Sequence, residues 1–381
     1  MGSRRTFAVA AITAGGLMLA AGCGGSSSGT SSRGATNSAN SSTATSLAAF
    51  GGMNGLVAAA KKEGTLNVIT LPADWANYGT IMADFTKKYG IKINDANPDG
   101  SSQDEINAMV QLKGQTRAPD VLDMGTAFAI KADQQGLLAP YKVQSWSEIP
   151  ADSKASDATW YDDYGGYVAI GYNSAKVKTP PTSFADLMNP EYKNQVAING
   201  NPTQAGAALA AVYAAALASG GSFGNIEPGI DYFAKLHQVG NFVPVTGGPT
   251  TVQSGQTPIL VWWDYLLASE VQPVVPGFKI VIPADGHYAA YYSQAISKTA
   301  PDPAAARLWE EYLYSTTGQN LWLAGKARPI ELPNLVSSGT VNHAAYSALP
   351  TAPSGTLVFP TQAQLATAET LLSQQWASKI G

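Results

Sequence analysis

Residues 65–71, Thr-Leu-Asn-Val-Ile-Thr-Leu, begin the part of the chain that decides its fold. Their β-branched and apolar side chains predict a strand, and the apolar residues of 78–89 then recur at helical spacing. Residues 91–93 predict a second strand, Ser102 opens a second helix with a capping-box pattern, and residues 119–123 predict a third strand. This alternation predicts a mostly parallel sheet covered by helices, with ligands bound at the carboxyl ends of the strands.

A second unit of the same kind follows a Pro-rich break at residues 179–181. The expected elements are strands at 167–173, 195–198 and 258–263 and a buried Ala-rich helix at 205–218. Residues 278–282 and 288–296 are predicted as strands that return to the first unit, before a helix opened by Asp302 and Pro303. The chain therefore predicts two α/β lobes.

The N-terminal residues carry a predicted export signal. A charged start at residues 3–7, Ser-Arg-Arg-Thr-Phe, precedes an apolar stretch over 8–19 that is too short to span a bilayer. With Ala-Ala-Gly-Cys at residues 20–23, the segment resembles a bacterial lipoprotein signal, which implies removal of residues 1–22 and lipidation of Cys23. The paired arginines also resemble a twin-arginine export signal, and ordinary Sec export is the alternative that stays open.

The composition of the chain limits the disulfides it can form and the partners it can bind. Cys23 is the only cysteine, so no intramolecular disulfide can form. Residues 24–46 are almost wholly Gly, Ser, Thr, Ala and Asn, which is typical of a flexible tether. The net charge is −4, and loss of Arg4 and Arg5 with the signal makes it −6. No basic stripe is present, so we expect no nucleic-acid partner, and we expect a monomer.

A strand followed by seven segments in order resembles the extracellular solute-binding proteins of ABC importers. The similarity is strongest to the branch that holds polyamine, ferric-iron, thiamine and phosphonate receptors, and it runs from about Gly64 to Pro333. The segments are FTKKYGIKI (85–93), SSQDEI (101–106), APDVLDMG (118–125), GLLAPY (136–141), GYN (171–173), SFADLMNPEYKNQVAI (183–198) and PDPAAARLWEEYLYSTTGQ (301–319).

The resemblance implies a two-lobed type II periplasmic-binding-protein fold. Each lobe would be a mostly parallel sheet flanked by helices, two crossing strands would join the lobes, and a solute clamped between them would be delivered to a membrane permease. The expected organisation is a signal at 1–22, a lipidated cysteine and linker at 23–47, the first lobe at 48–172, the second at 173–283, and a return to the first lobe with C-terminal helices at 284–381.

The second lobe offers a cation-binding pattern at Trp262-Trp263-Asp264-Tyr265. It is similar to the Trp and Asp that grip an ammonium in polyamine receptors, which implies site roles for Trp263, Asp264 and Tyr265. A carboxylate and a π face both attract a cation when water is excluded. Because side chains alternate along a strand, only one of the two tryptophans can face the cleft, and the sequence leaves open which. The alternative is core packing for the tryptophan and helix capping for Asp264.

The first lobe supplies Asp74, Trp75 and Tyr78 directly after its opening strand, where ligands of parallel sheets bind. Ser101 and Ser102 lie at a helix N-terminus, which suits an anion such as a phosphonate. Asp104 and Glu105 in the same turn would repel an anion, so capping is the favoured interpretation for Ser102.

Further candidates close other strands or lie on an expected crossing. Asp123 and Thr126 end a first-lobe strand, and Thr203 follows a second-lobe strand. Tyr288, Tyr291 and Tyr292 are candidates for the cleft wall, and packing at the hinge or in the core is the favoured alternative for them. Ferric iron would need a pair of tyrosinates, but the rings of Tyr291 and Tyr292 should point to opposite faces of a strand.

The remaining patterns favour neither a cofactor nor catalysis. The histidines show no metal-ligand spacing, and we expect no cofactor and no resident metal. Residues 220–224 match the G-x-S-x-G pattern of hydrolases around Ser222, but a helix rather than a strand is expected to enter it. The sequence therefore predicts a tethered, non-enzymatic receptor outside the cytoplasm, with a polyamine-like cation as its solute. Ferric iron, thiamine or phosphonate binding are the alternatives within the family, and a hydrolase using Ser222 is the alternative from another class.

Overall fold

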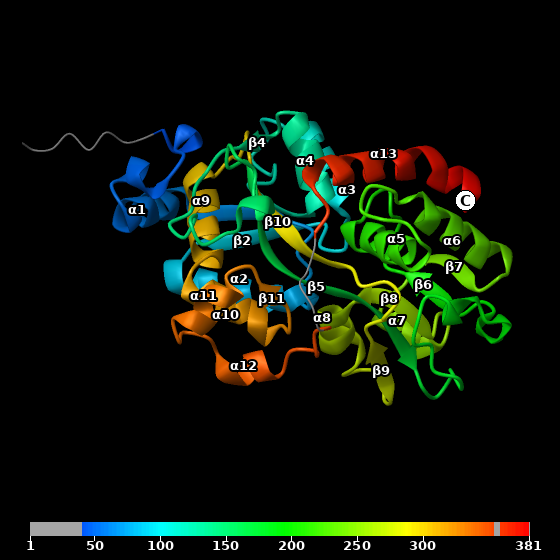
Figure 1. The fold of residues 1–381 in the computed structure, drawn as a ribbon. Coiled ribbons are helices and arrows are strands. Elements are labelled where there is room, and N and C mark those ends of the chain that lie inside the picture. The colour runs from blue at the N-terminus through cyan, green and yellow to red at the C-terminus, as the bar shows by residue number, and fades with distance from the viewer. Residues whose placement is uncertain (1–39, 354–358, 381) are drawn as a thin grey trace, which may run out of the picture. The chain divides into compact units, whose positions relative to one another are not determined.

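The computed structural model describes residues 40–353 and 359–380 (Figure 1). The predicted signal and Cys23 lie outside these residues. The elements that precede the two long strands are α1 (Met53–Glu63), β1 (Thr65–Ile69), α2 (Tyr78–Tyr89), β2 (Lys92–Ala96), α3 (Ser102–Gln111), β3 (Val121–Gly125), α4 (Thr126–Gln134) and β4 (Leu138–Ala139). With the helices α9 to α12 given below, they form the first lobe.

The predicted β-α-β-α-β order of the first lobe is confirmed. Helix α2 buries Tyr78, Ile81 and Phe85 on one face, and Gly90 ends it in the left-handed region at φ 72°. Strands β1 and β2 pair in parallel. These two strands form a sheet of their own and end at a common edge, whereas β3 belongs to a separate nine-stranded sheet.

The second lobe lies between the two long strands in the sequence. Its elements are β6 (Val196–Ile198), α5 (Gly206–Ala218), α6 (Glu227–Gln238), β7 (Phe242–Thr246), α7 (Pro249–Ser254), β8 (Ile259–Trp263), α8 (Asp264–Leu266), the π-helical turn η7 (Leu267–Val271) and β9 (Phe278–Val281). Strand β6 pairs in parallel with both β7 and β8. The Ala-rich helix α5 is buried from Ala207 to Ala216, which confirms the predicted buried helix.

Two long strands, β5 (Trp160–Asn173) and β10 (Ala289–Ser297), join the lobes (Figure 1). The first half of β5 pairs antiparallel with β10, which in turn pairs with β3. The second half of β5 pairs antiparallel with β8 and β9. The nine-stranded sheet is thus mixed, with parallel pairs confined to β6, β7 and β8, and β5 is shared by both lobes.

The chain after β10 returns to the first lobe and then crosses again. Its elements are α9 (Pro303–Leu313), α10 (Thr316–Ala324), β11 (Arg328–Pro329), α11 (Leu332–Ser337), α12 (His343–Ser347) and α13 (Gln362–Lys379). Helix α13 packs against both α4 of the first lobe and α6 of the second (Figure 1). Lys131 of α4 pairs with Glu369, and Asp231 of α6 pairs with Lys379.

Two expectations are corrected. Strand β9 pairs with the second-lobe end of β5, so residues 278–281 do not return to the first lobe and lie inside the range 173–283 given above for the second lobe. Residues 40–46, expected to be part of the tether, are docked, because Arg307 donates to the backbone oxygens of Ser42 and Ala44. Within the described residues, no helix combines the length and the hydropathy needed to cross a membrane.

Candidate functional site

A cleft of about 490 Å³ lies where strand ends and helix N-termini of both lobes meet. Its wall includes six carboxylates and three aromatic rings, and no Lys, Arg or His among the described residues that line it. The carboxylates belong to Asp74, Asp99, Asp104, Glu105, Asp123 and Glu270, and the rings to Trp75, Trp262 and Tyr292. The cleft is therefore strongly acidic and partly aromatic.

Asp123, at the end of β3, is the most constrained of these carboxylates. Its Oδ2 accepts hydrogen bonds from the hydroxyls of Tyr78 at 2.8 Å and Tyr164 at 2.7 Å. Its Oδ1 is buried and has no partner among the described residues. Only 6% of the residue is exposed. One oxygen is thus held in place, and the other is left to bind a donor, as buried acceptors generally require.

Glu105 lies beside Asp123 and reinforces the negative potential. Its Oε2 accepts from the backbone N–H of Asp123 at 3.0 Å. Burial raises the pKa of Asp123 to about 7, and burial together with the Asp123 charge raises the pKa of Glu105 well above its ordinary value. A cation in this corner would favour the ionised form of both groups.

A second pair of carboxylates lines the cleft, one from each lobe. Glu270 reaches the cleft from the π-helical turn η7, and Asp74 faces it from the loop after β1. Burial, with a smaller contribution from the Asp74 charge, raises the pKa of Glu270 to about 8. Its Oε1 is buried and unpaired among the described residues. Each lobe therefore contributes a carboxylate to the same part of the cleft.

Three rings form an aromatic corner, defined as Trp75, Trp262 and Tyr292. Trp75 meets Trp262 edge to face with ring centroids 5.7 Å apart, and it meets Tyr292 in the same way at 5.5 Å. The corner combines side chains of the first lobe, the second lobe and the crossing strand β10. Aromatic faces of this kind attract cations through their quadrupoles.

The loop that carries Trp75 has an unusual backbone. Ala76 and Asn77 both adopt left-handed conformations, with φ of 46° and 72°. Such conformations cost energy for residues other than glycine and are concentrated at functional sites. The turn places the Trp75 indole so that its Nε1 donates to the Tyr164 hydroxyl at 2.7 Å.

The cation pattern predicted in the second lobe is corrected by the structure. Trp262 lines the cleft, whereas Trp263 lies on the other side of the strand against a separate cavity. Asp264 is fully buried and paired with Arg328 at 2.7 Å, and Tyr265 is buried beside it. None of Trp263, Asp264 and Tyr265 lines the cleft. Alternation along β8 sends Trp263 to the face opposite Trp262, and Asp264 and Tyr265 are buried in α8.

Most of the first-lobe candidates line the cleft, and one supports it from behind. Asp74, Trp75, Ser101 and Ser102 line the cleft, whereas Tyr78 is fully buried behind Asp123. The capping box at the start of α3 uses Ser101 and Asp104 instead of Ser102. The Ser102 hydroxyl accepts from the backbone N–H of Gly125 at 3.2 Å.

Three other candidates surround a smaller cavity of about 50 Å³ behind the cleft. Thr126, Tyr288 and Tyr291 line this rear cavity, and Tyr292 borders both spaces. Thr203 lines neither, since its hydroxyl donates to Asn201 at 2.9 Å in a local turn. Of the three tyrosines, Tyr292 lines the cleft wall.

Sequence reasoning missed several wall residues. Glu270 gave no signal, because it lies in a π-helical turn with no strand end nearby in the sequence. Glu105 was considered only as an obstacle to anions. Thr246, the last residue of β7, also lines the cleft and could have been found from topology. Asn199 and Asn201 line the cleft just after β6, where topology alone makes them candidates.

The hydrolase pattern does not form a nucleophile elbow. Helix α5 ends at Ala218, Ser222 makes a backbone bridge with Asn225, and α6 begins at Glu227. No strand of the described residues leads into Ser222, so the geometry that such a nucleophile needs is missing there.

Comparisons with known proteins agree with the fold. A thiamine-binding periplasmic protein of Brucella suis is 28% identical over 141 residues, which cover 35% of this chain and 40% of that protein. The chain thus spans less than half of this curated relative.

Solved structures match over most of the chain. The periplasmic binding protein AfuA from Actinobacillus pleuropneumoniae, solved with fructose-6-phosphate, has a TM-score of 0.66 at 18% identity, covering 83% of this chain and 98% of that one. The ferric binding protein from Campylobacter jejuni has a TM-score of 0.62 at 18% identity, covering 82% and 99%. At such identities the similarity shows the shared periplasmic-binding-protein fold and leaves the solute unassigned.

A family model identifies the chain more directly. The model of bacterial extracellular solute-binding proteins matches residues 117–352, which include both crossing strands and the whole second lobe. The chain therefore belongs to the family of bacterial extracellular solute-binding proteins.

Proposed function

We propose that this protein captures a small organic cation in the acidic cleft and delivers it to an ABC permease, performing no chemistry on it. The observation that carries this proposal is the composition of the wall: six carboxylates and three aromatic rings, with no cationic side chain among its described residues. Carboxylates and π faces are the two groups that stabilise a cation away from water.

An anionic solute fits this cleft poorly. The N-terminus of α3 could attract a phosphonate through its dipole, but Asp104 already accepts the Ser101 N–H at 2.9 Å there. The neighbouring carboxylates of Asp99 and Glu105 would repel the anion.

Ferric iron also fits poorly. It would need phenolates, but Tyr291 borders the rear cavity and only Tyr292 reaches the cleft. Burial raises the pKa of Tyr291 to about 12 and raises that of Tyr292 further, which disfavours both phenolates.

The polyamine and thiamine alternatives share the required chemistry. The pattern that favoured a polyamine, Trp263 and Asp264, lies outside the cleft, so a linear diamine loses its specific support. The Brucella relative binds thiamine by name, and thiamine is an aromatic cation that suits the aromatic corner. We therefore propose the wider class of organic cations, with thiamine and putrescine as its test molecules.

Thermal shift and calorimetry with thiamine, putrescine, spermidine, ferric citrate and 2-aminoethylphosphonate test this proposal. A solute that binds only the folded form raises the melting temperature. Asp123→Asn should weaken cation binding by about tenfold or more, because it removes the charge and keeps the shape. Glu227→Gln is the control, since this exposed carboxylate lies outside the cleft. Stabilisation by the phosphonate alone would overturn the proposal.

The lipid tether belongs to the same proposal. Cys23 would carry the lipid and hold a monomeric receptor at the outer face of the cell membrane, within reach of its permease. Cys23→Ser should move the protein from the membrane fraction to the soluble fraction. Retention of this variant in the membrane would contradict lipid anchoring at Cys23.

A further inference from the structure

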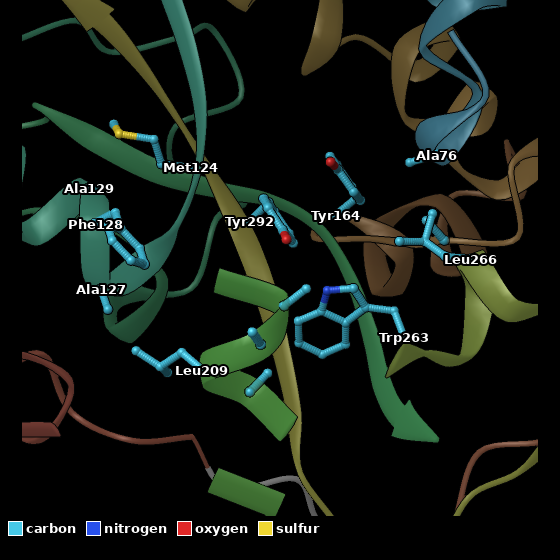
Figure 2. Packing of buried hydrophobic residues seen from close by; sticks show 14 of the residues in the cluster. Ala76, Met124, Ala127, Phe128, Ala129, Tyr164, Leu209, Trp263, Leu266 and Tyr292 are labelled. Carbon is cyan, nitrogen blue, oxygen red and sulfur yellow. The ribbon is translucent and has the colours of Figure 1, made fainter. Parts of the chain in front are cut away.

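Tyr164 of β5 contacts three parts of the cleft wall from behind without lining the cleft. Its hydroxyl donates to Asp123 Oδ2 at 2.7 Å and accepts from Trp75 Nε1 at 2.7 Å. Its ring stacks parallel to that of Tyr292 with centroids 5.7 Å apart, as Figure 2 shows for these two labelled residues. It also stacks on Trp322, with ring centroids 4.2 Å apart.

We infer that Tyr164 is a positioning residue that holds the solute-binding acid and the aromatic corner in one fixed geometry. A single hydroxyl joins the carboxylate to the indole, so the anionic and aromatic walls cannot move independently. Tyr164 is fully buried on a strand shared by both lobes, which gives this link a rigid base. The inference rests on the proposed function.

The charged and titratable groups around Asp123 come from several elements. Glu105 of α3 and Tyr78 of α2 contact it, and Asp163, Tyr265, Tyr292 and Glu310 interact with it electrostatically from β5, α8, β10 and α9. Among these influences, the Tyr164 hydrogen bond lowers the pKa of Asp123. Loss of the hydroxyl should therefore raise this pKa further.

Tyr164→Phe tests the inference because it keeps the ring and removes the hydroxyl. Binding of thiamine and of putrescine should weaken about tenfold, and the pH midpoint of binding should move upward. A merely structural loss would lower affinity equally at every pH. Tyr314→Phe is the matched control, since its buried hydroxyl also makes two hydrogen bonds, to the backbone of Tyr161 and Asp162, away from the cleft.

A measurement on the solute-free protein tests the role of Tyr164 even if neither thiamine nor putrescine binds. The indole N–H of Trp75, identified by NMR through its loss in Trp75→Phe, should exchange faster in Tyr164→Phe than in the wild type or in Tyr314→Phe. Unchanged exchange overturns the inference. Binding by the wild type with unchanged affinity and pH midpoint in Tyr164→Phe overturns it as well, whereas failure of the wild type to bind either cation counts against the proposed function alone.

A different observation concerns the contact between the lobes. Gly125 ends β3 in the first lobe, and Gly206 begins α5 in the second. A Cβ on Gly125 would lie 2.8 Å from the Cα of Gly206, and a Cβ on Gly206 would lie 2.8 Å from the Cα of Gly125. Real Cβ atoms do not approach backbone so closely, so only glycine permits this contact.

Neither backbone can easily shift to make room. Gly125 pairs with Tyr292 in the sheet, and its N–H donates to Ser102. Gly206 leads directly into the buried stretch of α5. We infer that the Gly125–Gly206 contact is the fulcrum on which the two lobes close, so that one added methyl group holds them apart.

Disulfide trapping without any solute tests this second inference. Gln103 and Gln204 lie close together across the lobes, because the backbone N–H of Gln103 donates to the backbone oxygen of Gln204 at 3.1 Å. In a Cys23→Ser background, Gln103→Cys with Gln204→Cys should cross-link under oxidised glutathione when the lobes close. Adding Gly206→Ala, or Gly125→Ala, should slow cross-linking about tenfold.

Gly224→Ala is the control, because its nearest neighbour would be a side-chain atom of Gln364 at 3.7 Å, an ordinary contact. Far-UV circular dichroism establishes that each variant is folded. Cross-linking at the parental rate in Gly206→Ala and Gly125→Ala overturns the inference. Unfolding of both variants also overturns it, since the contact would then be a requirement of folding.

Discussion

The guanidinium of Arg328 donates to the buried carboxylate of Asp264 at 2.7 Å. The second oxygen of Asp264 accepts from the backbone N–H of Tyr167 at 2.9 Å, and Arg328 lies over the Tyr167 ring with its guanidinium 4.8 Å from the centroid. The ion pair therefore connects Asp264, at the start of α8, to Arg328 of β11, and both residues contact Tyr167 of β5. Its carboxylate is neutralised inside the protein and has no free face for a solute.

Asp264→Ala should destabilise the protein while leaving cation affinity close to that of the wild type. Removal of one partner from a buried ion pair leaves the other charge unpaired, at a cost of about 3 kcal/mol in the free energy of unfolding. Urea unfolding measures this loss. The double variant with Arg328→Met should recover part of it, because no charge then remains unpaired. Normal stability with lost binding would instead return Asp264 to the site.

The two adjacent tryptophans of β8 should respond differently to substitution. Trp262→Leu should weaken the binding of thiamine or putrescine by about 0.5–2 kcal/mol, because it removes a π face from the cleft. Trp263→Leu should lower the melting temperature with little change in affinity, since this ring packs away from the cleft. Calorimetry and thermal unfolding of both variants compare the two effects. Equal losses of affinity would contradict this assignment.

The sequence predicted the elements well because its local signals are strong. Helical spacing from Tyr78 to Phe85, the Ala-rich run of α5 and the strand at 258–263 all depend on neighbours in the chain. The left-handed Gly90 at the end of α2 is equally local. Such patterns show how often apolar side chains recur along the chain, and this spacing determines which secondary structure forms and which face is buried.

The site was harder to predict because it depends on register and on distant partners. Alternation shows that Trp262 and Trp263 face opposite sides of β8, but only its pairing with β5 decides which side is the cleft. Arg328 is 64 positions away from Asp264, so nothing local shows that the carboxylate is already paired.

Cation binding should strengthen as the pH rises from 6 to 8.5. Burial raises the pKa of Asp123 to about 7 and that of Glu270 to about 8, so both carboxyls are largely protonated at pH 6 and attract a cation weakly. Ionisation above these values restores the attraction, and binding below them should release protons. Calorimetry of putrescine binding in buffers of different ionisation enthalpy measures both effects. Affinity that falls with rising pH over this range would contradict the acidic-cleft interpretation.

The solute-free protein should lose stability as the pH rises from about 4 to 7. The folded-state pKa values of Asp120, Asp123 and Asp162 are raised to about 7, whereas an unfolded Asp titrates near 4. Between about pH 4 and 7 the folded state therefore retains protons that the unfolded state has released. The free energy of unfolding then falls as the pH rises, by about 1.4 kcal/mol per pH unit for each such proton, and levels off above the folded-state pKa.

Urea unfolding at pH 5, 6, 7 and 8 measures this slope. Asp123→Asn should make it shallower by about one proton, because the amide does not titrate. A bound cation should recover more stability at pH 8 than at pH 6, because the Asp123 carboxylate is largely ionised at pH 8. Stability that stays constant or increases from pH 5 to 8 would contradict the raised pKa values of these buried carboxyls. The carboxylates of the cleft would then be ionised in the folded protein without any bound cation.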